Sequence, residues 1–321
     1  MVRFFLFLLF LAAVGFGLYE WEQASFSAPG PAAHETVVLI VPGDGIAKIS
    51  QKLAAGGVIG NAELFKWGVR LRGRAGALKA GEYAVPARAS EADITALLVA
   101  GFSLQHKITA AEGLTSEMIY SIVASDPALE GDAGPVPAEG TLLPETYLFT
   151  HGTTRSEILS RMARDQDKFV AAHWAIRAPG LPFKSPGEAL VMASIVEKET
   201  ALPDERRHIA AVFINRLKLG MKLQSDPTII YGLTRGFPLG RGIRQSEVGG
   251  ATPYNTYVIA GLPPTPICNP GKDAILAVLN PADSRDLYFV ANGSGGHVFT
   301  DNIVEHERNV AVWRRIEAAH H

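Results

Sequence analysis

Two glutamates at the end of an apolar stretch are the most suggestive catalytic groups in this sequence. Glu197 and Glu199 lie in the segment IVEKET at positions 195–200, which continues an apolar run that begins at Leu190. Apolar surroundings desolvate a carboxyl group and raise its pKa, and an acid that stays protonated near neutral pH can donate its proton to a glycosidic oxygen. The segment is therefore a candidate for the general acid/base of a glycoside-cleaving enzyme.

Helical spacing does not decide between the two acids. In a helix Glu197 shares a face with Ala193, and Glu199 shares a face with Ile195, so either carboxyl could be partly desolvated. Both could instead lie on the surface or cap N–H groups near a helix end. The local pattern by itself favours that non-catalytic interpretation.

Three other segments carry polar groups that suit a sugar-binding groove. EGTLLPETY at 139–147 is expected to form a turn that presents Glu145, and LQSDPT at 223–228 places Gln224 and Asp226 on one side of a short alternating stretch that Pro227 ends. TPYNTY at 252–257 sets the ring of Tyr254 beside the amide of Asn255, as sugar-binding walls do. Each segment could equally be an ordinary turn or core element.

Composition excludes several other kinds of chemistry. The formal charge of -2 gives no electrostatic footprint for nucleic acid, and the single cysteine allows neither an internal disulfide nor a cysteine-based zinc cage. No HExxH or Gly-x-Ser-x-Gly motif is present. We therefore expect carboxylate chemistry with no metal and no cofactor.

The first residues predict a membrane anchor. Arg3 precedes an uncharged run from Phe4 to Tyr19, and no small-x-small cleavage site follows it. We expect residues 1–22 to form a cytoplasmic tip and a retained transmembrane helix, with the rest of the chain outside the cytoplasm. A cleaved signal peptide, which would leave a soluble periplasmic protein, is the alternative.

Patterning divides the remaining chain into a linker and two domains. Residues 23–35 are rich in Ser, Ala, Pro and Gly and predict a tether. Residues 36–103 predict a small α/β unit with strands at 37–41 and 81–85. Its expected helices run from Ile46 until Gly56 and Gly57 stop the first, around 62–71, and from Ser90 until the segment closes at Gly101. Residues 104–318 predict a larger mixed α+β domain. Its expected elements are helices at 116–123, 156–170, 185–200 and 204–219, the last capped by Asp204, and a hairpin at 287–300.

Taken in order, these segments resemble the YceG-like, or MltG-type, endolytic murein transglycosylases. The resemblance rests on EGTLLPETY, ASIVEKET, VFINRLKLGMKLQSDPTIIYG, TPYNTYVIAGLPPTPICNPG and LYFVANGSGGHVFT, which follow one another over about 170 residues. It implies a single-pass inner-membrane protein of α+β class, with a periplasmic enzyme domain and a LysM-like subdomain at 36–103. Gly45 stands where a LysM turn usually carries Thr or Ser, a departure from the family pattern that leaves glycan binding by this unit open.

The resemblance also implies a reaction. It is cleavage of the β-1,4 bond between N-acetylmuramic acid and N-acetylglucosamine within peptidoglycan strands, with formation of a 1,6-anhydromuramyl end and termination of glycan elongation beside peptidoglycan synthases. In the family pattern the catalytic acid falls on Glu197. Glu145, Gln224, Asp226, Tyr254 and Asn255 are the expected groove residues. A lysozyme-like hydrolase and a non-catalytic wall-binding scaffold are the rival interpretations.

Overall fold

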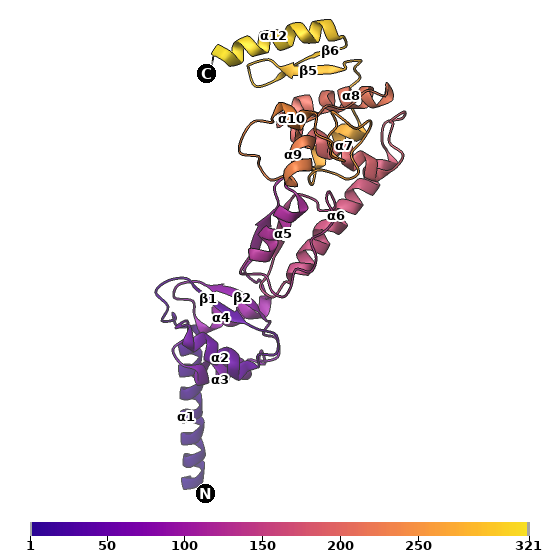
Figure 1. Cartoon of the computed structure of the whole chain (residues 1–321). Helices are drawn as coiled ribbons and strands as arrows, with labels where there is room; N and C mark the ends of the chain where they lie inside the picture. Colours follow the sequence, from indigo (N-terminus) through magenta and orange to yellow (C-terminus); the bar gives the residue numbers. More distant parts are fainter. Residues whose placement is uncertain (1, 320–321) are drawn as a thin grey trace. The chain divides into compact units, whose positions relative to one another are not determined.

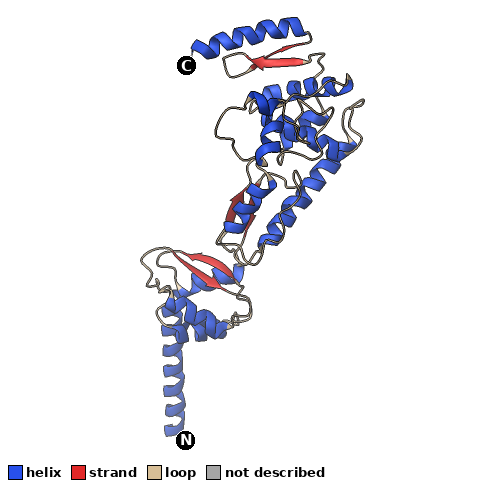
Figure 2. Ribbon diagram, viewed as in Figure 1, coloured by secondary structure: helices blue, strands red, loops and turns tan. Residues whose placement is uncertain are grey.

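The structure of the protein is a computed structural model that describes residues 2–319, and it divides into two compact units (Figure 1). Of the described residues, one unit comprises 2–106 with 148–152, and the other comprises 107–147 with 153–319. Helices dominate, and the strands form short two-stranded sheets (Figure 2). The expected α+β class is confirmed.

The first unit begins with a long apolar helix, α1 (Val2–Ser27). Its most apolar 18-residue window has a mean hydropathy of 2.1 and no buried residue, so the helix is long and apolar enough to cross a membrane. The helix does not end at residue 22 but continues into the expected tether. Phe26 is the physical reason, because its ring stacks on Phe65 at a centroid distance of 6.3 Å and is buried there.

The rest of the first unit is a two-stranded sheet packed with three helices. β1 and β2 pair antiparallel, with Thr36 opposite Val85 and Ile40 opposite Gly81. The core includes Leu53, Phe65, Tyr83 and Ile94. The elements, which closely match those expected, are β1 (Thr36–Ile40), α2 (Ile46–Ala55), α3 (Ala62–Leu71), β2 (Gly81–Val85) and α4 (Glu91–Ala100).

The second unit is built around helix α7 (Pro186–Glu199), which Ser185 caps through its side chain. Residues 191–196 of α7 are all buried, as the apolar run predicts. α7 packs against four other helices, which are α6 (Arg155–Ala175), α8 (Pro203–Lys218), α9 (Asp226–Thr234) and α11 (Lys272–Leu279). The smaller helices of this unit are α5 (Ser116–Ser125) and α10 (Gln245–Val248). Two further strands of the chain, β3 (His106–Thr109) and β4 (Thr146–Phe149), pair with each other.

Two local expectations for the second unit are wrong. α8 begins at Pro203 after Leu202, and Asp204 lies in its first turn instead of capping it. The stretch expected to alternate as a strand is also not a strand, because Gln224 has a positive φ of 54° and Asp226 already starts α9. Pro227 opens this helix, since proline fits the first helical turn, where no intrahelical N–H bond is lost.

The C-terminal part of the second unit is the expected hairpin followed by a helix that the sequence analysis did not identify. β5 (Tyr288–Ala291) and β6 (His297–Thr300) pair antiparallel, and α12 (Ile303–Ala319) packs along both strands (Figure 1). Glu305 N–H donates to Oδ1 of Asn302 at 2.9 Å, which fixes the start of α12. The hairpin therefore delivers α12 to the neighbourhood of α8.

Candidate active site

The carboxyl groups of Glu197 and Glu199 have different partners. Two residues along a helix correspond to a rotation of about 200°, so the side chains leave α7 in nearly opposite directions. Oε2 of Glu197 accepts from Gly271 N–H at 2.9 Å, whereas Oε1 of Glu199 accepts from the hydroxyl of Ser225. The two acids therefore belong to different surroundings.

Glu199 lies in the wall of a pocket of about 370 Å³. The wall contains the carboxyl groups of Glu199 and Asp226 and the guanidinium of Arg216, together with aromatic rings and an amide. It is assembled from the ends of α7 and α8, the start of α9, the loop after α10, strand β5 and helix α12. The remaining lining residues are Phe213, Leu223, Gln224, Tyr257, Phe289 and His306.

The surroundings of Glu199 suit a proton donor. Burial raises the pKa of Glu199 to about 7, the hydrogen bond from Ser225 opposes this shift, and the negative charge of Asp226 adds to it. A carboxyl group with a pKa near neutrality is protonated in a substantial fraction of molecules and can also act as a base after losing its proton. Glu199 therefore has the properties that general acid/base catalysis requires.

The segment next to Glu199 is held in a strained conformation. Gln224 has φ of +54°, a left-handed conformation that is uncommon for a residue other than glycine. Two bonds hold this segment, since Gln224 N–H donates to the Thr256 carbonyl at 3.2 Å and Ser225 N–H donates to Thr256 Oγ1 at 2.9 Å. Backbone strain of this kind is characteristic of functional sites. Here it places Gln224, Ser225 and Asp226 together beside Glu199.

Two residues that the sequence analysis did not single out organise the pocket. The hydroxyl of Tyr257 donates to Oδ1 of Asp226 at 2.8 Å. Arg216 donates through Nε to the Leu287 carbonyl at 2.6 Å and through Nη1 to the Leu223 carbonyl at 2.7 Å. Tyr257 lies in TPYNTY, but nothing local in the sequence links Arg216 to the site. Arg216 thereby joins the segment before α9 to the segment before β5.

Glu197 has a different environment at the start of α11. Its carboxylate accepts from the N–H of Gly271, which is the N-cap residue of that helix, so Glu197 supplies negative charge to a helix N-terminus. Burial raises the pKa of Glu197, the Gly271 bond opposes this shift, and nearby Glu112 adds to it. Glu145 lies close by, because Lys272 Nζ donates to it at 2.7 Å. Neither Glu197 nor Glu145 lines the pocket of Glu199.

Tyr254 and Asn255 also lie outside the lining of that pocket. Asn255 is 1% exposed, and its amide nitrogen donates to three carbonyls, those of Glu247, Val248 and Gly250, at 2.7–3.2 Å. The hydroxyl of Tyr254 lies 2.9 Å from that of Thr265. These contacts hold the loop that carries Tyr257. Of the five expected groove residues, only Gln224 and Asp226 line the pocket with Glu199.

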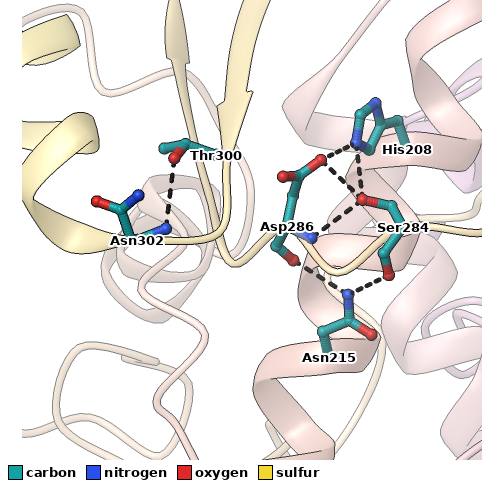
Figure 3. Close-up of polar contacts among 6 residues, drawn as sticks. All are labelled: His208, Asn215, Ser284, Asp286, Thr300 and Asn302. Carbon is teal, nitrogen blue, oxygen red and sulfur yellow. Dashed lines mark hydrogen bonds and ion pairs between the residues drawn. The ribbon is translucent and has the colours of Figure 1, made fainter.

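A cluster of His208, Ser284 and Asp286 resembles a catalytic triad in composition only (Figure 3). Asp286 Oδ2 and Ser284 Oγ lie 2.6 and 3.1 Å from the same imidazole nitrogen, Nε2. A triad instead uses the two ring nitrogens for the two different partners. Asn215 Nδ2 donates to the carbonyls of Ser284 and Asp286 at 2.9 and 3.1 Å. The cluster therefore fastens the segment before β5 to α8.

Known proteins with a similar sequence or a similar structure identify the family of this chain. The model of the YceG-like family matches residues 38–312, which is most of the chain. The chain belongs to the YceG-like family. A crystal structure of a putative yceG-like protein from Listeria monocytogenes superimposes with a TM-score of 0.54 at 28% identity, over 86% of this chain and 98% of that chain.

Two relatives of this YceG-like protein have curated names. The endolytic murein transglycosylase of Streptococcus pneumoniae serotype 2 (strain D39 / NCTC 7466) is 37% identical over 180 residues, which are 54% of this chain and 32% of that protein. The endolytic murein transglycosylase of Bacillus subtilis (strain 168) is 36% identical over 173 residues, or 54% of this chain and 47% of that protein. The chain thus matches less than half the length of these relatives.

Proposed function

We propose that this YceG-like protein is an endolytic lytic transglycosylase of peptidoglycan. It cleaves the β-1,4 bond between N-acetylmuramic acid and N-acetylglucosamine inside glycan strands, leaves a 1,6-anhydromuramyl end and thereby terminates strand elongation. The names of the curated relatives support the substrate and the reaction. The observation that carries the proposal is the carboxyl of Glu199, which lies in a polar pocket with its pKa raised to about 7.

Glu199 is the better-supported general acid in this proposal. The resemblance assigns the role to Glu197, and this assignment stays a prediction. Two observations favour Glu199: it lines the pocket with Gln224 and Asp226, and within residues 2–319 its carboxyl accepts a hydrogen bond from the Ser225 hydroxyl alone. Glu197 instead accepts a hydrogen bond from the N-terminus of α11, a contact that would also stabilise that helix.

The proposed chemistry needs one carboxyl in two protonation states. Protonated Glu199 donates its proton to the glycosidic oxygen, so the bond from C1 of the muramyl unit to that oxygen breaks and the leaving sugar keeps the proton. The Glu199 carboxylate then accepts the proton of the muramyl C6 hydroxyl, whose oxygen attacks C1 and closes the 1,6-anhydro ring. No water is consumed, and Glu199 returns to its protonated state.

The other pocket residues have supporting roles in this scheme. The carboxylate of Asp226 raises the pKa of Glu199, and in this scheme it also stabilises the positive charge that develops at C1. Tyr257 holds Asp226 through its hydroxyl. The exposed amide of Gln224 offers hydrogen bonds to sugar hydroxyls. Glu145, Tyr254 and Asn255 stay predicted groove residues. The hydrogen bonds described above give each of them a second role, which is to hold a loop or a helix in place.

The proposal includes a cellular location and a domain plan. α1 serves as a single-pass anchor in the inner membrane, residues 36–103 form a LysM-like unit, and residues 104–318 form the catalytic domain in the periplasm, beside peptidoglycan synthases. The length and apolar composition of α1 support the anchor. Sequencing the N-terminus of the mature protein tests it, since a start after residue 24 means a cleaved signal and a soluble protein.

Mass spectrometry of digested glycan strands tests the reaction. A lyase gives anhydro ends, whereas a lysozyme-like hydrolase with the same acid gives reducing ends that are heavier by one water, about 18 Da. Reducing ends as the main product would leave a glycosidase and refute the lyase. No cleavage together with glycan binding would instead support a wall-binding scaffold.

A further inference from the structure

His306 is a pocket residue that the proposed chemistry leaves without a role. It lines the pocket of Glu199 from the first turns of α12, a helix that is far from α7 in the sequence. The backbone N–H of His306 donates to the carbonyl of Asn302 at 3.2 Å, so it lies in the ordered start of the helix. α12 thus contributes a titratable side chain to a pocket otherwise formed by α7–α9, β5 and the Tyr257 loop.

The imidazole of His306 is held by stacking. Its ring lies over that of Tyr288, with a centroid distance of 5.0 Å and an angle of 24° between the planes. On the same tyrosine, the guanidinium carbon of Arg216 lies 5.3 Å from the ring centroid. Arg216 is in turn bound to two carbonyl groups. His306 is therefore a pre-oriented group, which loses little conformational entropy when it binds a ligand.

The ring nitrogens of His306 have unused hydrogen-bonding capacity. Within residues 2–319, neither ring nitrogen has a hydrogen-bond partner, and Nδ1 is buried. Burial and the neighbouring charge of Arg216 lower the pKa of His306, which favours the neutral ring. Because Nδ1 is buried, Nε2 is the ring nitrogen that a ligand in the pocket would meet, as a donor or as an acceptor. Polar groups in folded proteins are rarely left unpaired, and an unpaired group at the edge of a pocket points to a ligand.

The charges in the pocket indicate the chemistry of that ligand. Two carboxyl groups, Glu199 and Asp226, face the pocket against the single guanidinium of Arg216, and two N–H groups of that guanidinium already bind carbonyls. An anion gains no net attraction from this set. A neutral ligand rich in hydroxyl and amide groups can use the free amide of Gln224 and the imidazole together.

We propose that His306 is a substrate-binding residue, whose imidazole exchanges a hydrogen bond with a hydroxyl or acetamido group of the sugar in the Glu199 pocket. This inference rests on the proposed glycan-cleaving function and deepens it. α12 then takes part in substrate recognition, and Tyr288 is the positioning residue that orients the imidazole. The interaction is present in bound substrate and transition state alike, so its loss raises KM more than it lowers kcat.

Kinetics with three full-chain variants test the role of His306. His306→Phe keeps a ring on Tyr288 and removes both nitrogens, whereas His306→Asn keeps a hydrogen-bonding group. His173→Phe in α6 is the matched control, because His173 does not line the pocket. We expect KM for glycan strands to rise about tenfold in His306→Phe and much less in His306→Asn and in the control. An unchanged KM in His306→Phe would overturn the proposal.

A binding measurement separates this inference from the proposed reaction. NMR of the histidine ring protons is recorded in the full chain carrying Glu199→Gln, with a tetrasaccharide of alternating N-acetylglucosamine and N-acetylmuramic acid as the probe. We expect the His306 signal to move on titration while that of His173 stays in place. If wild-type protein does not cleave glycan but the His306 signal moves, the lyase proposal fails and this one holds. A stationary His306 signal at saturation would refute the binding role.

Discussion

The hydroxyl of Ser225 donates a hydrogen bond to Oε1 of Glu199, and the backbone N–H of Ser225 donates to Oγ1 of Thr256 at 2.9 Å. Ser225 thereby connects the acid at the end of α7 to the loop that carries Tyr257. Because Ser225 is buried, this connection is shielded from solvent and its geometry is well defined. The hydrogen bond from Ser225 should therefore affect both the pKa and the orientation of the Glu199 carboxyl.

Glutamine substitutions distinguish the two acids of α7. Glu199→Gln removes the proton donor with little change in shape, and we expect release of anhydro products to fall by about 10²–10⁴-fold. Glu197→Gln keeps an acceptor for Gly271 N–H and loses only the charge at the N-terminus of α11. We expect nearly full activity and a free energy of unfolding lower by about 0.3–1 kcal/mol. Liquid chromatography of the products and urea denaturation provide these measurements.

The opposite pattern would restore the assignment that the sequence resemblance implies. If Glu197→Gln is inactive while Glu199→Gln cleaves glycan at the wild-type rate, Glu197 is the general acid and the pocket of Glu199 has another function. Circular dichroism of both variants is the control, because loss of the fold would also abolish cleavage.

The raised pKa of Glu199 predicts how activity depends on pH. Its value of about 7 means that the protonated acid is lost as pH rises above 7, so kcat/KM should fall through that range. A profile that stays flat from pH 6 to 9 would contradict a role for Glu199 as the acid. Measuring kcat/KM at constant ionic strength excludes screening effects as the cause.

The same pKa also predicts how stability depends on pH. The pKa of Glu199 is about 7 in the folded protein and near its ordinary value of 4.5 in the unfolded chain, so the folded state binds more protons between these values. Stability is therefore highest below pH 4.5 as far as this group is concerned and falls as pH rises to 7. The size is about 3 kcal/mol. Denaturation at pH 5 and pH 8 should show a smaller loss in Glu199→Gln than in wild type, and the remainder comes from other carboxyls with a raised pKa, such as those of Glu91 and Glu197.

Ser225→Ala tests the hydrogen bond to Glu199. The bond from Ser225 lowers the pKa of Glu199, so its removal should raise that pKa and move the upper limb of the pH–rate profile to higher pH. The carboxyl also loses its orienting partner, so we expect a lower maximum rate. Ser246→Ala is the control, because Ser246 lies exposed on α10. An unshifted profile in Ser225→Ala would show that the bond does not tune Glu199.

Two tyrosines in one loop provide a matched pair. Tyr257→Phe removes the donor to Asp226 at 2.8 Å, and Tyr254→Phe removes the hydroxyl that lies 2.9 Å from that of Thr265. We expect kcat/KM to fall about tenfold in Tyr257→Phe, since the Asp226 carboxylate loses a charge-assisted hydrogen bond, and to change little in Tyr254→Phe. Equal losses in both variants would indicate a general effect on the loop.

Alanine substitutions at two glycines distinguish the cost of a strained backbone from the cost of a steric clash. Gly140 and Gly134 have φ of 79° and 74°, but a Cβ at position 140 would lie 2.5 Å from the Pro266 ring, while one at position 134 meets nothing within 4 Å. Gly134→Ala should cost about 1–2 kcal/mol for the left-handed backbone. Gly140→Ala should cost more, because a proline ring cannot rotate away. Thermal unfolding of both variants gives the comparison, and equal costs would show that Pro266 yields.

Much of the fold could be predicted because its signals are local. Asn61 caps α3, Ser90 forms a capping box at α4 and Ser185 caps α7, and each capping residue directly precedes a helix with an apolar face. The extension of α1 could not be predicted in this way. Its continuation to Ser27 depends on Phe65, a residue whose contact with Phe26 the local sequence does not reveal.

The site was only partly predictable for the same reason. Gln224 and Asp226 were expected to lie together, and they do so, but through a positive φ and a helix start instead of a strand. Asn255 stays a predicted sugar contact, and the local sequence does not reveal that its amide nitrogen donates to the carbonyls of Glu247, Val248 and Gly250. No local sequence pattern marks Arg216 or His306 as pocket residues. They meet in the pocket only because β5 and α12, which are distant from α8 in the chain, pack near it.

The sequence by itself determined the family, the apolar helix α7 and the presence of two acids at its end, since these follow from ordered motifs and from the periodicity of apolar residues. It could not decide which acid faces the pocket, because both have apolar neighbours one helical turn earlier. Only the tertiary structure decided this. It gives Glu197 the N-terminus of α11 and gives Glu199 a polar pocket, because the neighbours that set a carboxyl's pKa come from segments distant in the chain.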